Sequence, residues 1–153
     1  MDPVHQLLEI EAIKRLKARY FRLMDTKDWT GWLDLFTDDM VLEFDTAVST
    51  GGRNGKPVRV EGKAAVAEFV PASLNAAVQT VHHGHMPEVE LISETEARGV
   101  WAMEDIVDRG DDLVRAYGHY HETYRKEDGE WRIRTVHLTR LRITQVLKGQ
   151  NRL

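Results

Sequence analysis

The sequence contains no cysteine among its 153 residues. Without thiols there can be no disulfide framework, no thiolate nucleophile and no cysteine-ligated metal. An excess of basic residues is also missing, because 21 Lys and Arg against 25 Asp and Glu give a formal net charge of −4. The basic residues are scattered and form no stripe that could follow a phosphate backbone, so a nucleic-acid partner is not expected.

Long apolar runs are absent too. No run approaches the length of a membrane span, and the N-terminus lacks a basic segment followed by an apolar core. We therefore expect no membrane partner and a cytoplasmic location, with which the lack of cysteine agrees. At 42% hydrophobic residues, the chain can build one core, and we expect a single domain over residues 1–153.

Apolar residues recur at helical spacing in the first part of the chain. Val4 to Met24 predicts a long amphipathic helix after an Asp-Pro start signal. We expect Asp28 to cap a second, shorter helix, whose apolar stripe runs to Phe36 before Thr37-Asp38-Asp39 ends it. A third helical segment covers roughly residues 63–77 and is interrupted by a proline.

Alternation of apolar and polar residues predicts strands over most of the remainder. The first lies at residues 40–46 and forms a hairpin with residues 58–60 across a glycine-rich loop. Four more follow, one opened by Val81 to His85 and continuing to Ile92, then about 97–107, 113–125 and 131–146. Helices first and a long antiparallel meander afterwards favour an α+β fold.

The two-residue period of a strand assigns faces to the segment 113–125. Its even positions are small or apolar, so this set is expected to face the helices. Tyr120 then points inward, whereas His119 and His121 lie on the outer face.

The last strand changes its parity along its length. Trp131 and Ile133 are apolar at odd positions, but Val136 and Leu138 are apolar at even ones. This change predicts a bulge or strong twist near Thr135. Such a bulge would turn the side chain of Arg140 inward.

Four polar residues from separate elements could together move protons on a small molecule: Tyr20, Asp25, His82 and Arg140. Each also has a structural alternative. Asp25 could cap a helix, Tyr20 could be a core residue with a satisfied hydroxyl, and Arg140 could be a solvated charge. Only one of the adjacent His82 and His83 can face a pocket, because neighbouring strand residues point to opposite faces.

Histidines at 82, 83 and 85 also raise the question of a metal. A zinc site would need a third ligand that converges with these histidines. An aspartate that orients His82 is the more economical role for Asp25.

Four segments carry a family resemblance that covers nearly the whole chain. They are YFRLMDTKDW at Tyr20 to Trp29, LFTDD at Leu35 to Asp39, VHHGH at Val81 to His85, and DGEWRI at Asp128 to Ile133. With helices packed on a curved antiparallel sheet, the chain resembles the SnoaL-like, scytalone-dehydratase-like branch of the nuclear-transport-factor-2-like superfamily.

The resemblance implies a cone-shaped, curved antiparallel sheet packed against the N-terminal and middle helices around an apolar pocket. It implies no single reaction, because the fold hosts dehydratases, isomerases, dehydrochlorinases, cyclases and binding proteins. The branch does its chemistry without a metal, so the resemblance implies neither a metal nor another cofactor. Scytalone dehydratase and hexachlorocyclohexane dehydrochlorinase carry a proton-abstracting pair that matches Asp25 and His82. The Tyr-x4-Asp spacing of Tyr20 and Asp25 is similar to that of bile-acid 7α-dehydratase. Arg140 looks like the basic residue that this enzyme and the dehydrochlorinase carry near the end of the final strand.

From these features we expect a cofactor-independent lyase or isomerase, dehydratase-like, that acts on a small, largely apolar cyclic molecule. His82 held by Asp25 would abstract the proton, with Tyr20 or Arg140 assisting the departing group. The expected substrate-binding residues are Met24, Phe44, His83, Trp101 and Tyr120. The alternative is a non-catalytic module that binds a small molecule or serves as a structural oligomer. We also expect a homotrimer or homodimer that covers the outer face of the sheet.

Overall fold

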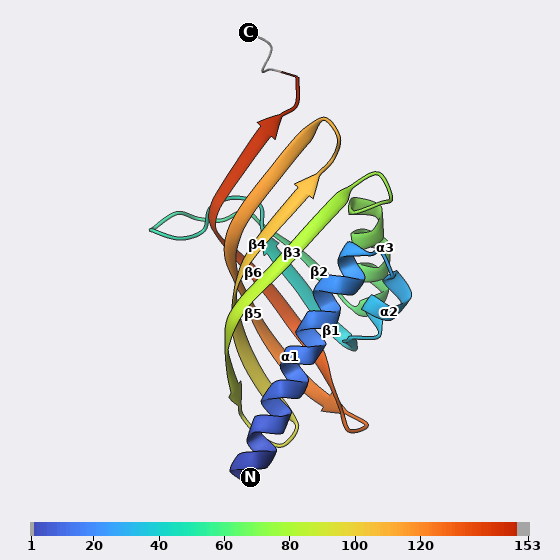
Figure 1. The fold of residues 1–153 in the computed structure, drawn as a ribbon, viewed down its shortest axis with the longest axis vertical. Helices are drawn as coiled ribbons and strands as arrows, with labels where there is room; N and C mark the ends of the chain where they lie inside the picture. The colour runs from blue at the N-terminus through green and yellow to red at the C-terminus, as the bar shows by residue number, and fades with distance from the viewer. Residues whose placement is uncertain (1, 150–153) are drawn as a thin grey trace.

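The computed structural model describes residues 2–149, which form a curved, unclosed sheet with helices against one face (Figure 1). The helices are α1 (Pro3–Asp25), α2 (Trp29–Leu33) and α3 (Lys63–Ser73). The strands are β1 (Phe36–Asp45), β2 (Pro57–Glu61), β3 (Gln79–Leu91), β4 (Glu96–Asp108), β5 (Asp112–Glu127) and β6 (Glu130–Leu147). Along the sheet the strands follow the order β2-β1-β6-β5-β4-β3.

The α+β class predicted from the sequence is confirmed, with one correction to the strand directions. β3 to β6 form the expected antiparallel meander, and β1 forms the expected hairpin with β2. β1 and β6, however, run parallel, so the sheet is mixed and not wholly antiparallel. The parallel pair arises because the chain returns to β1 from the far side of the sheet only after the whole meander.

Aspartate side chains cap the first two helices at their N-termini. The Asp2 carboxylate caps α1 by accepting a hydrogen bond from the backbone N–H of His5 at 3.1 Å. Asp28 caps α2 in the same way, accepting from the N–H of Gly31 at 3.0 Å. These caps satisfy amide groups that have no partner inside the helix. None of the helices within residues 2–149 is long and apolar enough to cross a membrane.

Two helix ends were predicted too far along the chain. α2 stops at Leu33, and Phe36 instead opens β1, because the Leu35 carbonyl accepts a hydrogen bond from the backbone N–H of Ile133. α3 ends at Ser73, after which the Asn75 side chain accepts from the Ala77 N–H at 2.9 Å and makes a turn. Pairing with β6 therefore ends α2, and a turn made by the Asn75 side chain follows the end of α3.

The predicted strand faces are confirmed. Ala116, Gly118 and Tyr120 of β5 are buried, and the Tyr120 ring packs against the rings of Tyr20 and Phe21 of α1, whereas His121 is exposed. In β6 the register slips by one residue at Arg134, next to the expected position. Coverage of the outer face by another subunit stays a prediction.

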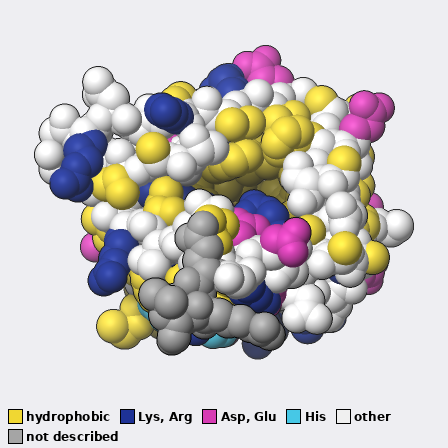
Figure 2. Space-filling view, turned by 90° about the horizontal axis from the view of Figure 1, so that it is seen from above, with side chains coloured by type: hydrophobic (Ala, Val, Ile, Leu, Met, Phe, Trp, Pro, Cys, Tyr) yellow, Lys and Arg dark blue, Asp and Glu magenta, His cyan; other side chains and the backbone are white. Residues whose placement is uncertain are grey.

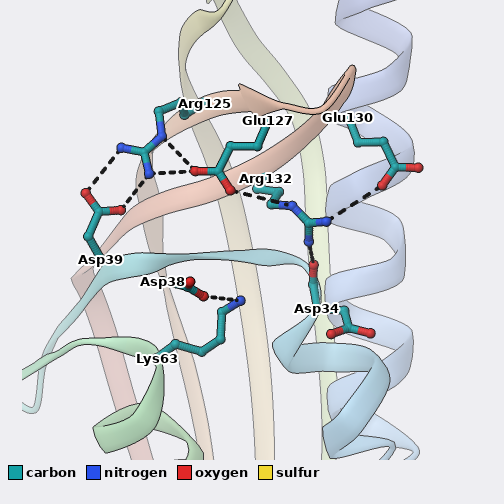
Figure 3. Close-up of polar contacts among 8 residues, drawn as sticks. All are labelled: Asp34, Asp38, Asp39, Lys63, Arg125, Glu127, Glu130 and Arg132. Carbon is teal, nitrogen blue, oxygen red and sulfur yellow. Dashed lines mark hydrogen bonds and ion pairs between the residues drawn. The ribbon is translucent and has the colours of Figure 1, made fainter.

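Ion pairs tie the strands together at the end of the sheet that holds the β5–β6 turn (Figure 3). The guanidinium of Arg125 contacts Asp39 of β1 at 2.9 Å and Glu127 at 2.6 Å. Arg132 donates to the carbonyl of Asp34, which follows α2. These partly exposed contacts add little stability singly, but they connect β1 and α2 to the β5–β6 hairpin.

A buried ion pair lies between α1 and β5. The side chains of Lys17 and Glu122 are both fully buried and contact each other directly. Tyr124 donates to the second carboxylate oxygen of Glu122 at 2.5 Å, and the Lys17 ammonium lies 3.6 Å from the ring centroid of Tyr120 and 3.8 Å from that of Tyr20. Burial lowers the pKa of Lys17, and the charge of Glu122 opposes that effect. The pair thus neutralises two charges that could not be buried separately.

We predict that Lys17→Met lowers the free energy of unfolding by about 3–5 kcal/mol, because it leaves the Glu122 carboxylate buried without a partner. Lys17→Met combined with Glu122→Leu should lose less than the single variant, since no isolated charge remains. Urea unfolding followed by circular dichroism measures both values. Lys14→Met, an exposed change one turn earlier in α1, is the matched control. Equal stability of the Lys17 and Lys14 variants would contradict the prediction.

Candidate active site

A cavity of about 290 Å³ lies between the inner face of the sheet and the helices α1 and α3. Most of its wall is apolar, and its polar side chains come from α1, α3, β3, β4, β5, β6 and the turn after β4. The lining residues are Tyr20, Met24, Leu42, Phe44, Phe69, Val70, Ser73, Leu74, His82, Asp105, Val107, Arg109, Tyr120, Val136, Leu138 and Arg140. Figure 2 looks down on a hollow lined with hydrophobic side chains, with basic and acidic side chains together at one side. A volume of this size suits a small molecule.

The end of α1 carries Asp25 to the start of β3. Its Oδ1 lies 2.7 Å from Nδ1 of His82, and its Oδ2 accepts from the backbone N–H of His82 at 2.8 Å. Thr80 adds a hydrogen bond to Oδ1 at 2.9 Å. The helix can approach this closely because Gly84 has no side chain, and a Cβ there would lie 2.5 Å from the ring of Phe21. The distance between Oδ1 and the ring nitrogen is that of a hydrogen bond.

The ionisation of Asp25 determines which ring nitrogen of His82 carries the proton. Burial raises the pKa of this carboxyl, but the hydrogen bonds from His82 and Thr80 outweigh that effect and hold the pKa below its ordinary value. An ionised carboxylate only accepts hydrogen bonds, so Nδ1 of His82 must be the donor. In the neutral imidazole, Nε2 is then left with its lone pair. His82 lines the cavity, so this site has a base available to a ligand.

The side chain of Arg140 lines the cavity next to a bulge in β6. Its Nη1 donates to both carboxylate oxygens of Asp105, at 3.0 and 2.9 Å, and its Nε donates to the carbonyl of Asp45 at 3.3 Å. The second register slip of β6 falls at Leu141, directly after it. This bulge requires Gly118 on β5, because a Cβ there would lie 1.8 Å from the carbonyl oxygen of Thr139.

Two tyrosines form the floor of the cavity. Burial raises the pKa of Tyr20 far above its ordinary value, and the charge of Glu122 adds to this, while a hydrogen bond with Tyr120 opposes it. Burial likewise raises the pKa of Tyr120. Both phenols therefore keep their protons at neutral pH and are hydrogen-bond donors.

The structure brings most of the predicted site residues together. Tyr20, His82 and Arg140 line the same cavity, and Asp25 holds His82 from behind. Three of the five predicted substrate-binding residues, Met24, Phe44 and Tyr120, also lie in its wall.

The structure places the other two predicted substrate-binding residues elsewhere, which corrects those assignments. Trp101 is buried in the core, where its indole N–H donates to the Tyr124 hydroxyl at 2.8 Å. His83 is exposed on the opposite face of β3 from His82 and lies near His85, with 6.5 Å between the ring centroids and the ring planes tilted by 55°. His83 faces outward because neighbouring strand residues point to opposite faces. Trp101 is held in the core because Tyr124, which accepts its hydrogen bond, also donates to Glu122.

Sequence reasoning missed Asp105, Lys17 and Glu122. Each lies on the inward-facing side of its element. Lys17 follows Ile13 by one turn on the apolar stripe of α1, and Glu122 is one of the even-numbered residues of β5, which face inward. A charged residue within an inward-facing set was therefore the available signal. Asp105 is aligned with His82 across the β3–β4 pair, which only the register shows. Residues 2–149 contain no group of three or more His, Asp or Glu side chains arranged to hold a metal ion.

The fold is a cone-like α+β domain, and the candidate site is a group of polar side chains in its apolar cavity. The sequence profile of the SnoaL-like domain matches residues 5–137, so the chain belongs to that family, within the nuclear-transport-factor-2-like superfamily.

Several solved structures are similar to the chain. A protein from Novosphingobium aromaticivorans provisionally named a scytalone dehydratase has 22% identity and a TM-score of 0.78, over 91% of this chain and 88% of that one. Rv3472 of Mycobacterium tuberculosis, of unknown function, has 28% identity and a TM-score of 0.76, over 93% and 78%. The hexachlorocyclohexane dehydrochlorinase LinA-type3 from Novosphingobium barchaimii has 16% identity and a TM-score of 0.72, over 97% and 96%. The likenesses below a quarter identity establish the fold.

We predict that Asp25 stabilises the protein in a pH-dependent way. Its folded-state pKa lies below the unfolded value of about 4, so its ionised form adds stability above that pH, and the contribution is lost as the pH falls through the folded-state pKa. Asp25→Asn should cost about 1–3 kcal/mol near neutral pH and progressively less in acid. Urea unfolding of the wild type and of Asp25→Asn from neutral pH into acid measures the difference in their free energies of unfolding.

The matched control is Asp28→Asn, because asparagine caps a helix as well as aspartate and Asp28 is exposed. A stability difference between wild type and Asp25→Asn that stayed constant down to the acid limit would show that the ionised carboxylate contributes nothing.

Proposed function

We propose that the protein is a cofactor-independent lyase or isomerase that removes a proton from a carbon atom of a small, largely apolar cyclic substrate. His82 is the base in this proposal, and Asp25 orients it. The observation that carries the proposal is the Asp25–His82 hydrogen bond of 2.7 Å at the wall of an apolar cavity that also contains Arg140 and Tyr20. Membership of the SnoaL-like family supports it, since dehydrochlorinase and dehydratase names occur among the structural neighbours.

In the proposed first step, Nε2 of His82 takes a proton from a carbon next to a carbonyl group. The electron pair of the broken C–H bond forms a carbon–carbon double bond, and the carbonyl π electrons move to oxygen, giving an enolate. The carboxylate of Asp25 stabilises the imidazolium that results. Ionisation of Asp25 and the donor role of Nδ1 favour this direction of proton flow.

The developing negative charge needs donors that stay protonated. Tyr20 has a raised pKa, so it stabilises oxygen through a hydrogen bond and is a weak source of protons. Arg140 is charge-balanced by Asp105, so the pair suits a neutral oxygen that gains charge only during the reaction.

Two outcomes are open to the enolate in this proposal. If the substrate carries a carbon–carbon double bond conjugated with the enolate, return of the proton from His82 to the far end of that double bond completes an isomerisation. Alternatively the electrons re-form the carbonyl and expel a hydroxyl at the β-carbon; with the proton from His82 this oxygen leaves as water, and the elimination is balanced.

We predict that the wild-type protein exchanges the α-protons of 4-phenylcyclohexanone for deuterium in D2O faster than buffer does. Asp25→Asn and His82→Ala should each lower the enzyme-dependent rate by about 10²–10⁴-fold, and the double variant should lose little more than either alone, because the two residues act as a unit. Mass spectrometry of the recovered ketone measures the exchange.

His83→Ala is the matched control, because this neighbouring imidazole lies on the exposed outer face. It should exchange at the wild-type rate. Equal rates for wild type, Asp25→Asn and His82→Ala would reject the proposal and leave a non-catalytic small-molecule-binding module as the better account.

A further inference from the structure

The exposure of the lining residues indicates where the cavity opens to solvent. Tyr20, Tyr120 and Val136 at its floor are buried. Ser73, at the end of α3, and Arg109, in the turn after β4, are its exposed lining residues. A ligand therefore enters and leaves between these two residues.

The entrance lies at a definite distance from the proposed base. His82 is paired with Asp105 across the β3–β4 ladder, so both lie at one level of the sheet. Arg109 follows Asp105 by four residues along an extended chain, which corresponds to about 13 Å at 3.3 Å per residue. The wall between these levels includes Val107, Phe69 and Leu74, and it is apolar.

The polar groups deep in the cavity are closely paired with one another, whereas the arginine at its entrance is paired more loosely. Asp105 balances Arg140 at 2.9 Å, and Asp25 is bonded to His82. Arg109 has a looser contact, with Asp112 at 3.5 Å, and its side chain is 48% exposed.

Two acidic neighbours of Arg109 in the chain, Asp112 and Asp108, are already engaged by other groups. Asp112 accepts from the Gln145 amide at 2.6 Å, and Asp108 is bound by Lys148 at 2.6 Å. The entrance therefore presents a guanidinium that is only partly satisfied.

We infer that the ligand of this cavity is an organic acid, with its anionic group at the end remote from the reacting carbon, where Arg109 binds it. This inference rests on the proposed function, which supplies the reacting end. The molecule has a neutral oxygen toward Arg140 and Tyr20, an apolar one- or two-ring body, and a carboxylate roughly 10 Å away at the entrance. A guanidinium binds carboxylate oxygens through several N–H groups at once, so it distinguishes an acid from its ester.

The test compares 4-(4-oxocyclohexyl)benzoic acid with its methyl ester, which differ in charge at one end and share the ketone at the other. Isothermal titration calorimetry at low ionic strength should show the acid binding wild type about tenfold more tightly than the ester. Arg109→Gln should remove this difference, and Arg109→Lys should restore part of it. Added salt should weaken the acid more than the ester.

Arg115→Gln is the matched control, because Arg115 is an exposed arginine on the outer face of β5. It should keep the preference for the acid. Equal affinity for acid and ester, no binding of the acid, or an acid preference that survives in Arg109→Gln would overturn the inference. Binding is measured without turnover, so its failure is separate from failure of deuterium exchange into the neutral ketone, which tests the proposed function.

Discussion

The buried ion pair between Lys17 and Glu122 is the contact on which the arrangement of this molecule depends. Two charges without solvent exposure lie together at the interface of α1 and the sheet, and neither could stay there alone. The ammonium lies against the rings of Tyr20 and Tyr120, the two phenols on the cavity floor. The pair thus sets the position of α1 along the sheet. Because Asp25 is two turns further along the same helix, this position also brings its carboxylate to His82.

The remainder of the site depends on departures from regular strand geometry. The register slip at Arg134 changes which residues of β6 face the helices, and the bulge at Leu141 follows Arg140 directly. Gly118 accommodates that bulge, and Gly84 allows α1 to approach β3. An uninterrupted sheet would turn Arg140 away from the cavity. The polar residues of the cavity are therefore collected by irregular positions on a scaffold that is otherwise regular.

Periodicity predicted the helices, the meander and the inward face of β5 because each depends on residues close in sequence. It also placed a bulge near Thr135, since parity changes between Ile133 and Val136. It missed the parallel pairing of β1 with β6, which joins segments about 95 residues apart, and the strand character of Phe36. Asp105 was missed because its nearness to Arg140 depends on the registers of three strands. The assignment of Trp101 to the cavity wall was wrong, because the sequence does not reveal the hydrogen bonds through Tyr124 to Glu122 that hold its indole in the core.

The central claim is that Asp25 holds the neutral His82 ring with its proton on Nδ1, leaving Nε2 as the base that faces the cavity. Long-range ¹H–¹⁵N correlation spectra of the uniformly ¹⁵N-labelled protein, assigned by comparison with His82→Ala, test it without a substrate. The account predicts that the neutral ring of His82 shows a protonated Nδ1 and an unprotonated Nε2, and that Asp25→Asn loses this preference. A neutral His82 with its proton on Nε2 in the wild-type protein would contradict the account, because no lone pair would then be available to accept the substrate proton.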